Sequence, residues 1–118
     1  MSKVKGTEEF DGGRFEELNI CMDGMKIGYV ELYKYFPDGG EEYGINFGYV
    51  KSIELIPEYR GQRIGTEILK SLANECHHIF IYADNDRAEC LYKRLGDVTD
   101  SVPDVLECED YDVMYVIY

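Results

Sequence analysis

Alternation of apolar and polar residues marks the first half of the chain as strands. Residues 15–22 (FEELNICM) and 25–36 (MKIGYVELYKYF) alternate on either side of Asp23-Gly24, a pair typical of a two-residue β-hairpin turn. A third apolar stretch, residues 43–56, follows the turn signal of residues 37–40 (PDGG). This pattern predicts an antiparallel meander of three strands.

The second half of the chain changes to helical spacing. Residues 64–76 predict a helix with one apolar face, made of Ile64, Ile68, Leu69, Leu72 and Cys76. A second helix is predicted from the capping residues 84–86 to Gly96, with an apolar face made of Ala88, Leu91, Tyr92 and Leu95. Between them, residues 79–82 (IFIY) predict a buried strand, which a right-handed crossover places parallel to the strand ending at Ile56.

The remaining segments complete one domain. Residues 102–106 and 111–118 predict two more strands, whereas the polar, acidic residues 1–13 predict a frayed end. A chain of 118 residues is long enough for one core and too short for two. We therefore expect a single α/β domain over residues 1–118.

Residues 57–66 (PEYRGQRIGT) connect the third strand to the first helix through a basic turn. The first N–H groups of a helix lack partners and, with the positive end of the helix dipole, can hold a phosphate. Arg60 and Arg63 add positive charge there, and Gly61 and Gly65 allow a ligand to approach the backbone. The turn matches neither a Walker A loop nor GxGxxG, and an ordinary strand–helix connection with surface arginines is the alternative.

Two motifs resemble those of a known family. Residues 57–66 resemble the acetyl-CoA pyrophosphate loop of the GCN5-related N-acetyltransferase (GNAT) superfamily, Arg/Gln-x-x-Gly-x-Gly/Ala. Arg60 and Gly65 match its outer positions, and Arg63 replaces its first glycine. Residues 85–96 (NDRAECLYKRLG) resemble the second signature of the family, Asn-x-x-Ala-x-x-apolar-Tyr-x-x-x-Gly, although Asp97 stands where Phe usually follows.

The resemblance covers residues 49–97 and implies the GNAT fold. This fold is a mixed, mostly antiparallel twisted sheet around a strand–phosphate loop–helix–strand–helix unit. Family members usually carry one or two helices between their first and second strands, and this chain has no room for them. We therefore expect those helices to be reduced or absent, and the acceptor site to be shallow or completed by the target or by a second subunit of a homodimer.

The resemblance also implies a co-substrate, acetyl-CoA, and no metal. The chain positions that match the family's cofactor-binding residues include backbone N–H donors on the third strand, the basic turn and the start of the second helix. They are Ile53, Leu55, Arg60, Gly61, Gln62, Arg63, Ile64, Gly65, Thr66, Asn85 and Ala88. Asn85 is a helix cap, a cofactor contact or both.

The implied reaction is transfer of an acetyl group from acetyl-CoA to a primary amine. An amine with a pKa of about 10.4 is mostly protonated at neutral pH, so a base or a water relay must take a proton. Glu54 is the nearest carboxylate to the expected site, and it is either this base or a solvated strand glutamate. Tyr92 matches the family tyrosine that protonates the departing sulfur, but its place on an apolar helix face also suits a core residue.

The net charge of −12 is opposite to that of a protein that binds nucleic acid through phosphate contacts. The charge serves solubility or attracts a cationic acceptor, such as a polyamine, another small amine, or a protein lysine or N-terminus. Two other classes stay open. One is a catalytically silent GNAT-fold protein that binds CoA or a protein partner, and the other is an acidic mimic of nucleic acid.

The chain has neither an apolar run of membrane-spanning length nor the apolar stretch of a signal peptide in residues 1–13. We therefore expect a cytoplasmic protein that does not contact membranes. Cys21, Cys76, Cys90 and Cys108 lack zinc-like spacing and predict free, mostly buried thiols.

Overall fold

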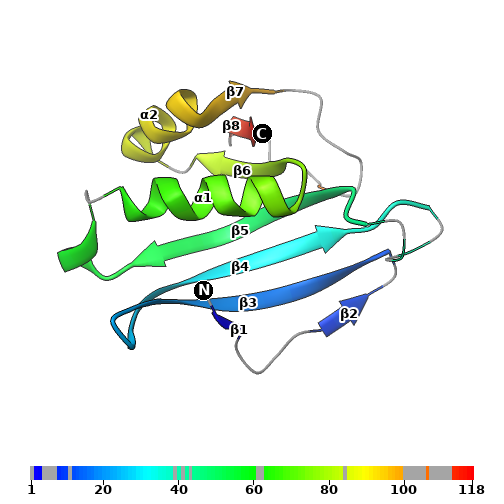
Figure 1. Cartoon of the computed structure of the whole chain (residues 1–118). Helices are drawn as coiled ribbons and strands as arrows, with labels where there is room; N and C mark the ends of the chain where they lie inside the picture. The colour runs from blue at the N-terminus through cyan, green and yellow to red at the C-terminus, as the bar shows by residue number, and fades with distance from the viewer. Residues whose placement is uncertain are drawn as a thin grey trace.

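The computed structural model describes residues 2–3, 8–10, 12–38, 40, 42, 44–60, 63–83, 85–99, 106 and 113–118. These residues form an eight-stranded sheet with two α-helices packed on one face (Figure 1). The helices are α1 (Ile64–Glu75) and α2 (Asp86–Leu95), and a 3-10 turn, η2 (Pro57–Tyr59), precedes α1. The strands are β1 (Ser2–Lys3), β2 (Glu8–Phe10), β3 (Gly13–Met22), β4 (Met25–Tyr35), β5 (Phe47–Leu55), β6 (Ile79–Ala83), β7 (Gly96–Val98) and β8 (Val113–Ile117).

The sheet is mixed and mostly antiparallel, which confirms the predicted fold class. Its strand order is β1-β3-β4-β5-β6-β8-β7, with β2 also paired to β3. Only β5 and β6, among the strands described, run parallel, and α1 connects them as predicted. The β3–β4 hairpin turns at Asp23 and Gly24, whose φ angles of 52° and 80° are both left-handed. Two left-handed residues give the turn the twist of the strands that it joins.

The prediction of a frayed end over residues 1–13 is wrong for the described part of that segment. Residues 2–3 and 8–10 are the strands β1 and β2, both paired with β3. The free edge of β3 offers backbone donors and acceptors that even a short segment can pair with. Phe10 adds ring contacts to Tyr33 at 5.9 Å and Tyr35 at 5.5 Å.

The strand β5 begins at Phe47, four residues later than predicted, and it contains a bulge. Gly44 has a left-handed φ of 92°, which interrupts the extended backbone before the strand. Within the strand, Glu31 of β4 pairs with Ser52 and Leu32 pairs with Val50, so Lys51 is an extra residue. The bulge shifts the alternation of side chains along the last part of β5.

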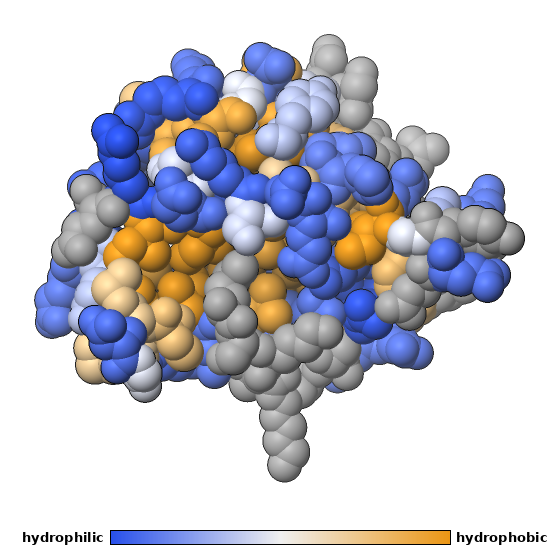
Figure 2. All heavy atoms as spheres, in the orientation of Figure 1, coloured by the Kyte–Doolittle hydropathy of each residue, from blue (hydrophilic) through white to orange (hydrophobic). Residues whose placement is uncertain are grey.

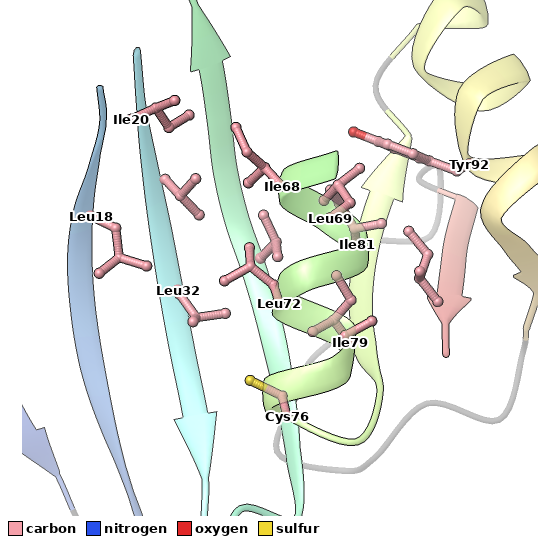
Figure 3. Close-up of a cluster of buried hydrophobic side chains, with 14 of the residues drawn as sticks. Leu18, Ile20, Leu32, Ile68, Leu69, Leu72, Cys76, Ile79, Ile81 and Tyr92 are labelled. Carbon is pink, nitrogen blue, oxygen red and sulfur yellow. The ribbon is translucent and has the colours of Figure 1, made fainter. Parts of the chain in front are cut away.

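Both helices pack on the same face of the sheet, through the apolar faces predicted for them. The apolar face of α1 lies over Leu18, Leu32 and Ile79, and Tyr92 of α2 closes the same cluster (Figure 3). Cys76 is fully buried at the end of α1, and burial raises the pKa of its thiol to about 11. Cys21 and Cys90 are thiols rather than disulfides, as predicted, but both are exposed rather than buried. Cys108 lies outside the described residues.

The end of the chain departs from the predicted pair of strands. Helix α2 stops before Gly96 as predicted, but Gly96 begins β7, which the sequence pattern did not reveal. A Cβ on Gly96 would lie 1.9 Å from the Val116 carbonyl oxygen, so close strand approach requires glycine here. The strand β8 confirms the strand predicted over residues 111–118. Of the strand predicted over residues 102–106, only Leu106 is described, and it is buried on the face of the sheet opposite the helices.

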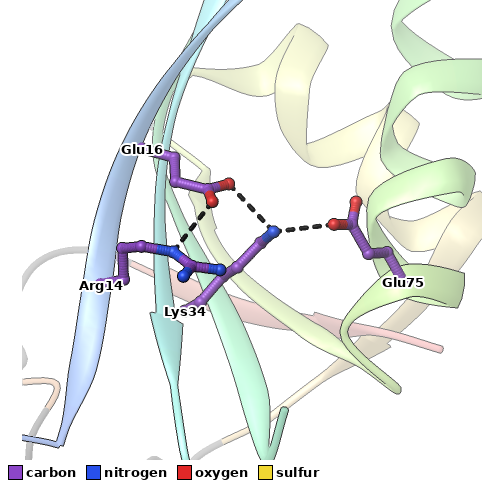
Figure 4. A network of polar contacts seen from close by, with 4 residues as sticks. All are labelled: Arg14, Glu16, Lys34 and Glu75. Carbon is purple, nitrogen blue, oxygen red and sulfur yellow. Dashed lines mark hydrogen bonds and ion pairs between the residues drawn. The ribbon is translucent and has the colours of Figure 1, made fainter. Parts of the chain in front are cut away.

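A buried ion-pair network fixes the end of α1 to the sheet (Figure 4). Lys34 Nζ of β4 lies 2.9 Å from Glu16 Oε2 and 2.7 Å from Glu75 Oε1, and Arg14 Nε donates to Glu16 Oε1 at 3.0 Å. Glu16 and Lys34 are 0% and 3% exposed. Burial lowers the pKa of Lys34, but hydrogen bonds to Glu75 and Glu16 outweigh that effect and raise it overall.

Candidate functional site

A cleft opens where β5 and β6 separate. The two strands pair only through residues 48–50 and 79–81, although both continue beyond that point. The cleft has a volume of about 920 Å³. Its lining comes from β5, the basic turn, α1 and α2: Ile53, Glu54, Leu55, Arg60, Arg63, Gly65, Thr66, Leu69, Asn85, Asp86, Arg87, Ala88, Leu91, Tyr92 and Arg94. On this side of the molecule, hydrophobic atoms show between the polar outer surfaces of α1 and α2 (Figure 2).

The bulge at Lys51 aims two backbone N–H groups of β5 into this cleft. The Gly48 N–H donates toward β6, to the His78 carbonyl, whereas the Ile56 N–H donates toward β4, to the Ile27 carbonyl. Because backbone groups alternate along a strand, this reversal places the N–H groups of Ile53 and Leu55 on the side away from β4. Beyond residue 50 that side has no pairing with β6.

The basic turn and the start of α1 form the adjoining wall. Arg63 caps α1 in a left-handed conformation with φ 64°, and the first intrahelical bond runs from the Glu67 N–H to the Arg63 carbonyl at 3.1 Å. The N–H groups of Ile64, Gly65 and Thr66 therefore have no acceptor within the helix. Arg60 Nε donates to the Leu55 carbonyl at 3.0 Å, which holds this guanidinium against the end of β5.

For three of the predicted residues in the turn, the structure describes no side chain in the cleft. Gly61 and Gln62 lie outside the described residues. The side chain of Ile64 packs on the helix-side core. Only the backbone of Ile64 is therefore placed to contribute to the site.

The second motif brings Asn85, Ala88 and Tyr92 to the opposite wall of the cleft. Asn85 Oδ1 accepts a hydrogen bond from the Ala88 N–H at 2.8 Å, so the predicted helix cap is confirmed. Tyr92 is 6% exposed, and its ring centre lies 5.9 Å from that of Tyr115. Its hydroxyl points from α2 toward the N-terminal half of α1 (Figure 3). Tyr92 is thus both a core residue and a cleft residue.

Glu54 lies between two cleft residues but on the other face of the sheet. It pairs with Tyr29, whereas Ile53 pairs with the buried Val30. Alternation therefore directs the exposed carboxylate of Glu54 away from α1. An amine that uses Glu54 as a base must approach from the face opposite the helices.

Two arginines of the site, Arg87 and Arg94, were not predicted from the sequence. Together with Leu91 they are spaced i, i+4 and i+7, which puts all three on one face of α2. That spacing was visible in the sequence, but only the packing of α2 shows which face meets the cleft. With Arg60 and Arg63, four guanidinium groups line a cleft in a chain whose net charge is −12.

Comparison with protein families identifies the domain. The model of the acetyltransferase (GNAT) family matches residues 7–97. The chain belongs to the GNAT acetyltransferase family. Membership in this family implies acyl-CoA N-acyltransferase activity, and the family uses acetyl-CoA. A search of the curated proteins found no match.

Solved structures show the same GNAT fold. A GNAT-family acetyltransferase from Staphylococcus aureus Mu50 is 20% identical, with a TM-score of 0.63 over 90% of this chain and 67% of that one. A GNAT-family acetyltransferase from Elizabethkingia anophelis, solved with acetyl-CoA bound, is 17% identical, with a TM-score of 0.54 over 91% of this chain and 76% of that one.

None of the helices in the described residues is long and apolar enough to cross a membrane.

Proposed function

We propose that this protein transfers the acetyl group of acetyl-CoA to the primary amine of a small cationic amine, a polyamine or a protein. The observation that carries the proposal is the meeting of three features in one cleft. The first is the N-terminus of α1 with the nearby arginines, and the second is the pair of backbone N–H donors at the end of β5. The third is Tyr92 of α2. Each would supply one requirement of acyl transfer, namely co-substrate binding, carbonyl polarisation and proton donation to the sulfur.

The residues present suit the pyrophosphate and arm of acetyl-CoA. Residues 60–66 would hold the pyrophosphate, because N–H groups without helical acceptors and the side chains of Arg60 and Arg63 converge there. Arg87 and Arg94 add positive charge on the facing helix. Asn85, Ala88 and the backbone of β5 would contact the arm that leads to the thioester.

Acetyl-CoA supplies a thioester carbonyl that an amine can attack. The N–H of Leu55, with Ile53 as its neighbour, would polarise that carbonyl and stabilise the negative charge on its oxygen. The acceptor first loses a proton, to Glu54 or to water, so that its nitrogen carries a lone pair. As the C–N bond forms and the C–S bond breaks, the Tyr92 hydroxyl would give its proton to the sulfur, and the nitrogen would lose its second proton to water, from which the Tyr92 phenolate would regain one.

Thiol release tests the proposal. Incubation with acetyl-CoA and a panel of primary amines should release CoA thiol only when an amine is present. The alternative is a catalytically silent protein that binds CoA, which is favoured by the lack of any helix before β4 in the described residues, where family members usually carry acceptor-site helices. Acetyl-CoA binding without thiol release for any amine or lysine peptide would support that alternative and contradict the proposal.

A further inference from the structure

The face of the sheet opposite the helices carries a continuous array of aromatic rings. Tyr33 of β4 lies at its centre, with ring centres 4.8 Å from Phe15, 6.1 Å from Tyr49 and 5.9 Å from Phe10. Tyr49 contacts Tyr82 of β6 in turn, at 6.0 Å. Most of these rings are only partly buried, and both α-helices of the described chain pack on the other face. Aromatic side chains in such number are typical of protein interfaces.

Carboxylates lie beside this array at positions that cost stability. Glu17 of β3 and Glu31 of β4 are directly paired, and like charges at such positions destabilise a sheet. Tyr29, two residues before Glu31 on β4, is opposite Glu54. No described residue forms an ion pair with Glu17, Glu31 or Glu54. The face therefore presents negative charge between aromatic rings, an arrangement that suits a cation.

The same face is continuous with the cleft. Glu54 of β5 is one of the residues that line the cleft, and its side chain lies on the same face of the sheet as the aromatic rings. An amine that reaches Glu54 from this side arrives beside the N–H groups of Ile53 and Leu55, across the strand from the acetyl-CoA side. The geometry therefore gives the acceptor an entrance separate from that of the co-substrate.

We propose that this surface, the acidic aromatic face (Phe15, Glu17, Tyr29, Glu31, Tyr33, Tyr49 and Glu54), docks a lysine-bearing polypeptide segment and presents one of its amines to the cleft. The inference rests on the proposed function and names the acceptor as a protein amine. The face crosses β3, β4 and β5, or about 10 Å at the usual strand spacing, and continues along the strands, which exceeds the footprint of one small amine. A second copy of this chain, also at −12, is the less suitable occupant because its charge repels.

The test is binding of a fluorescent lysine-rich peptide, followed by anisotropy, to the protein and to its Glu17→Gln/Glu31→Gln variant. Loss of two partly exposed carboxylate–lysine contacts should weaken the peptide about tenfold. The variant should fold at least as well as the parent, because it removes a like-charge pair. Tyr33→Leu, which removes the central ring, should weaken the peptide about threefold.

A matched control is Asp38→Asn/Asp97→Asn, which removes the same charge from exposed positions at other ends of the sheet. It should change peptide affinity by less than about twofold, because charge beyond a Debye length is screened. Acetyl-CoA binding and the rate with a small monoamine should be the same in all variants. Equal weakening by both double variants, or peptide affinity unchanged in Glu17→Gln/Glu31→Gln, would overturn the docking proposal.

The two proposals fail separately. Peptide binding that depends on Glu17 and Glu31, without thiol release from acetyl-CoA, would uphold the docking face and contradict the acetyltransferase. Acetylation of small amines, with peptide kinetics unaffected by the double variant, would uphold the acetyltransferase and contradict the docking face. A change of oligomeric state in Glu17→Gln/Glu31→Gln, without loss of peptide affinity, would assign the face to a second copy instead.

Discussion

Gly65→Glu should stabilise the protein and weaken its binding of acetyl-CoA at the same time. Gly65 is the second residue of α1, and a Cβ built there meets no atom within 4 Å, so a side chain fits there without strain. Replacing glycine by glutamate in the first turn of a helix stabilises the fold by about 0.5–1 kcal/mol, through helix propensity and the helix dipole. For a domain of this size, the melting temperature should rise by about 2–5 °C.

The carboxylate would lie in front of the Gly65 and Thr66 N–H groups, where the pyrophosphate is proposed to lie, and would repel its negative charge. Acetyl-CoA at about 100 times its dissociation constant stabilises the parent by about 2.7 kcal/mol. If the carboxylate weakens binding about 100-fold, that concentration equals the new dissociation constant, and the stabilisation falls to about 0.4 kcal/mol. The two effects of one substitution thus have opposite signs.

Thermal melts with and without acetyl-CoA measure both effects in one experiment. Asn74→Ala on the exposed side of α1 is the matched control, because it also raises helix propensity but lies away from the cleft. It should raise the melting temperature and leave the acetyl-CoA shift as in the parent. A Gly65→Glu protein with the parental shift would refute a pyrophosphate site at residue 65.

Four further predictions follow from the cleft, the buried network and the charge. Tyr92→Phe keeps the ring contact with Tyr115, so stability should change by no more than about 1.5 kcal/mol, while turnover measured by thiol release falls about 100-fold or more. Lys34→Met leaves Glu16 and Glu75 without their shared cation and should cost about 3–5 kcal/mol in urea unfolding. Because folding raises the pKa of Lys34 above 10.5, the contribution of Lys34 to the free energy of unfolding is complete below pH 10.5. The parent should lose this contribution as pH rises through the folded pKa, whereas Lys34→Met should show no such loss. A cationic amine should react faster than a neutral amine of similar size at low salt, and the difference should fade as salt shortens the Debye length, whereas equal rates at low salt would count against charge attraction.

Local patterns predicted the parts of the fold that local interactions decide. The Asp23-Gly24 turn, the Asn85 cap and the apolar faces of both helices all appear where the sequence placed them. The strands β1, β2 and β7 escaped prediction because two or three residues carry no periodicity, and their pairing depends on a neighbouring edge.

Residues of the candidate site could be predicted where they belong to a motif within one segment. They could not be predicted where the site depends on how distant segments pack. Arg60, Gly65 and Tyr92 were named from two motifs, and the structure brings them to one cleft. Sequence alone could not place the Glu54 carboxylate, since a bulge leaves no mark in a pattern of apolar and polar residues. The pairing of Glu17 with Glu31 likewise emerges only from strand register.

Lys51 can be lost without changing the side chains that β5 presents to the site. Val50 is opposite Leu32 and Ser52 is opposite Glu31, so a strand that lacks Lys51 keeps both pairs and simply has no bulge. Ile53, Glu54 and Leu55 would then keep their faces of the sheet. The bulge is an insertion that the sheet has absorbed, as a reading frame absorbs an added codon, and what it changes is the local twist of β5.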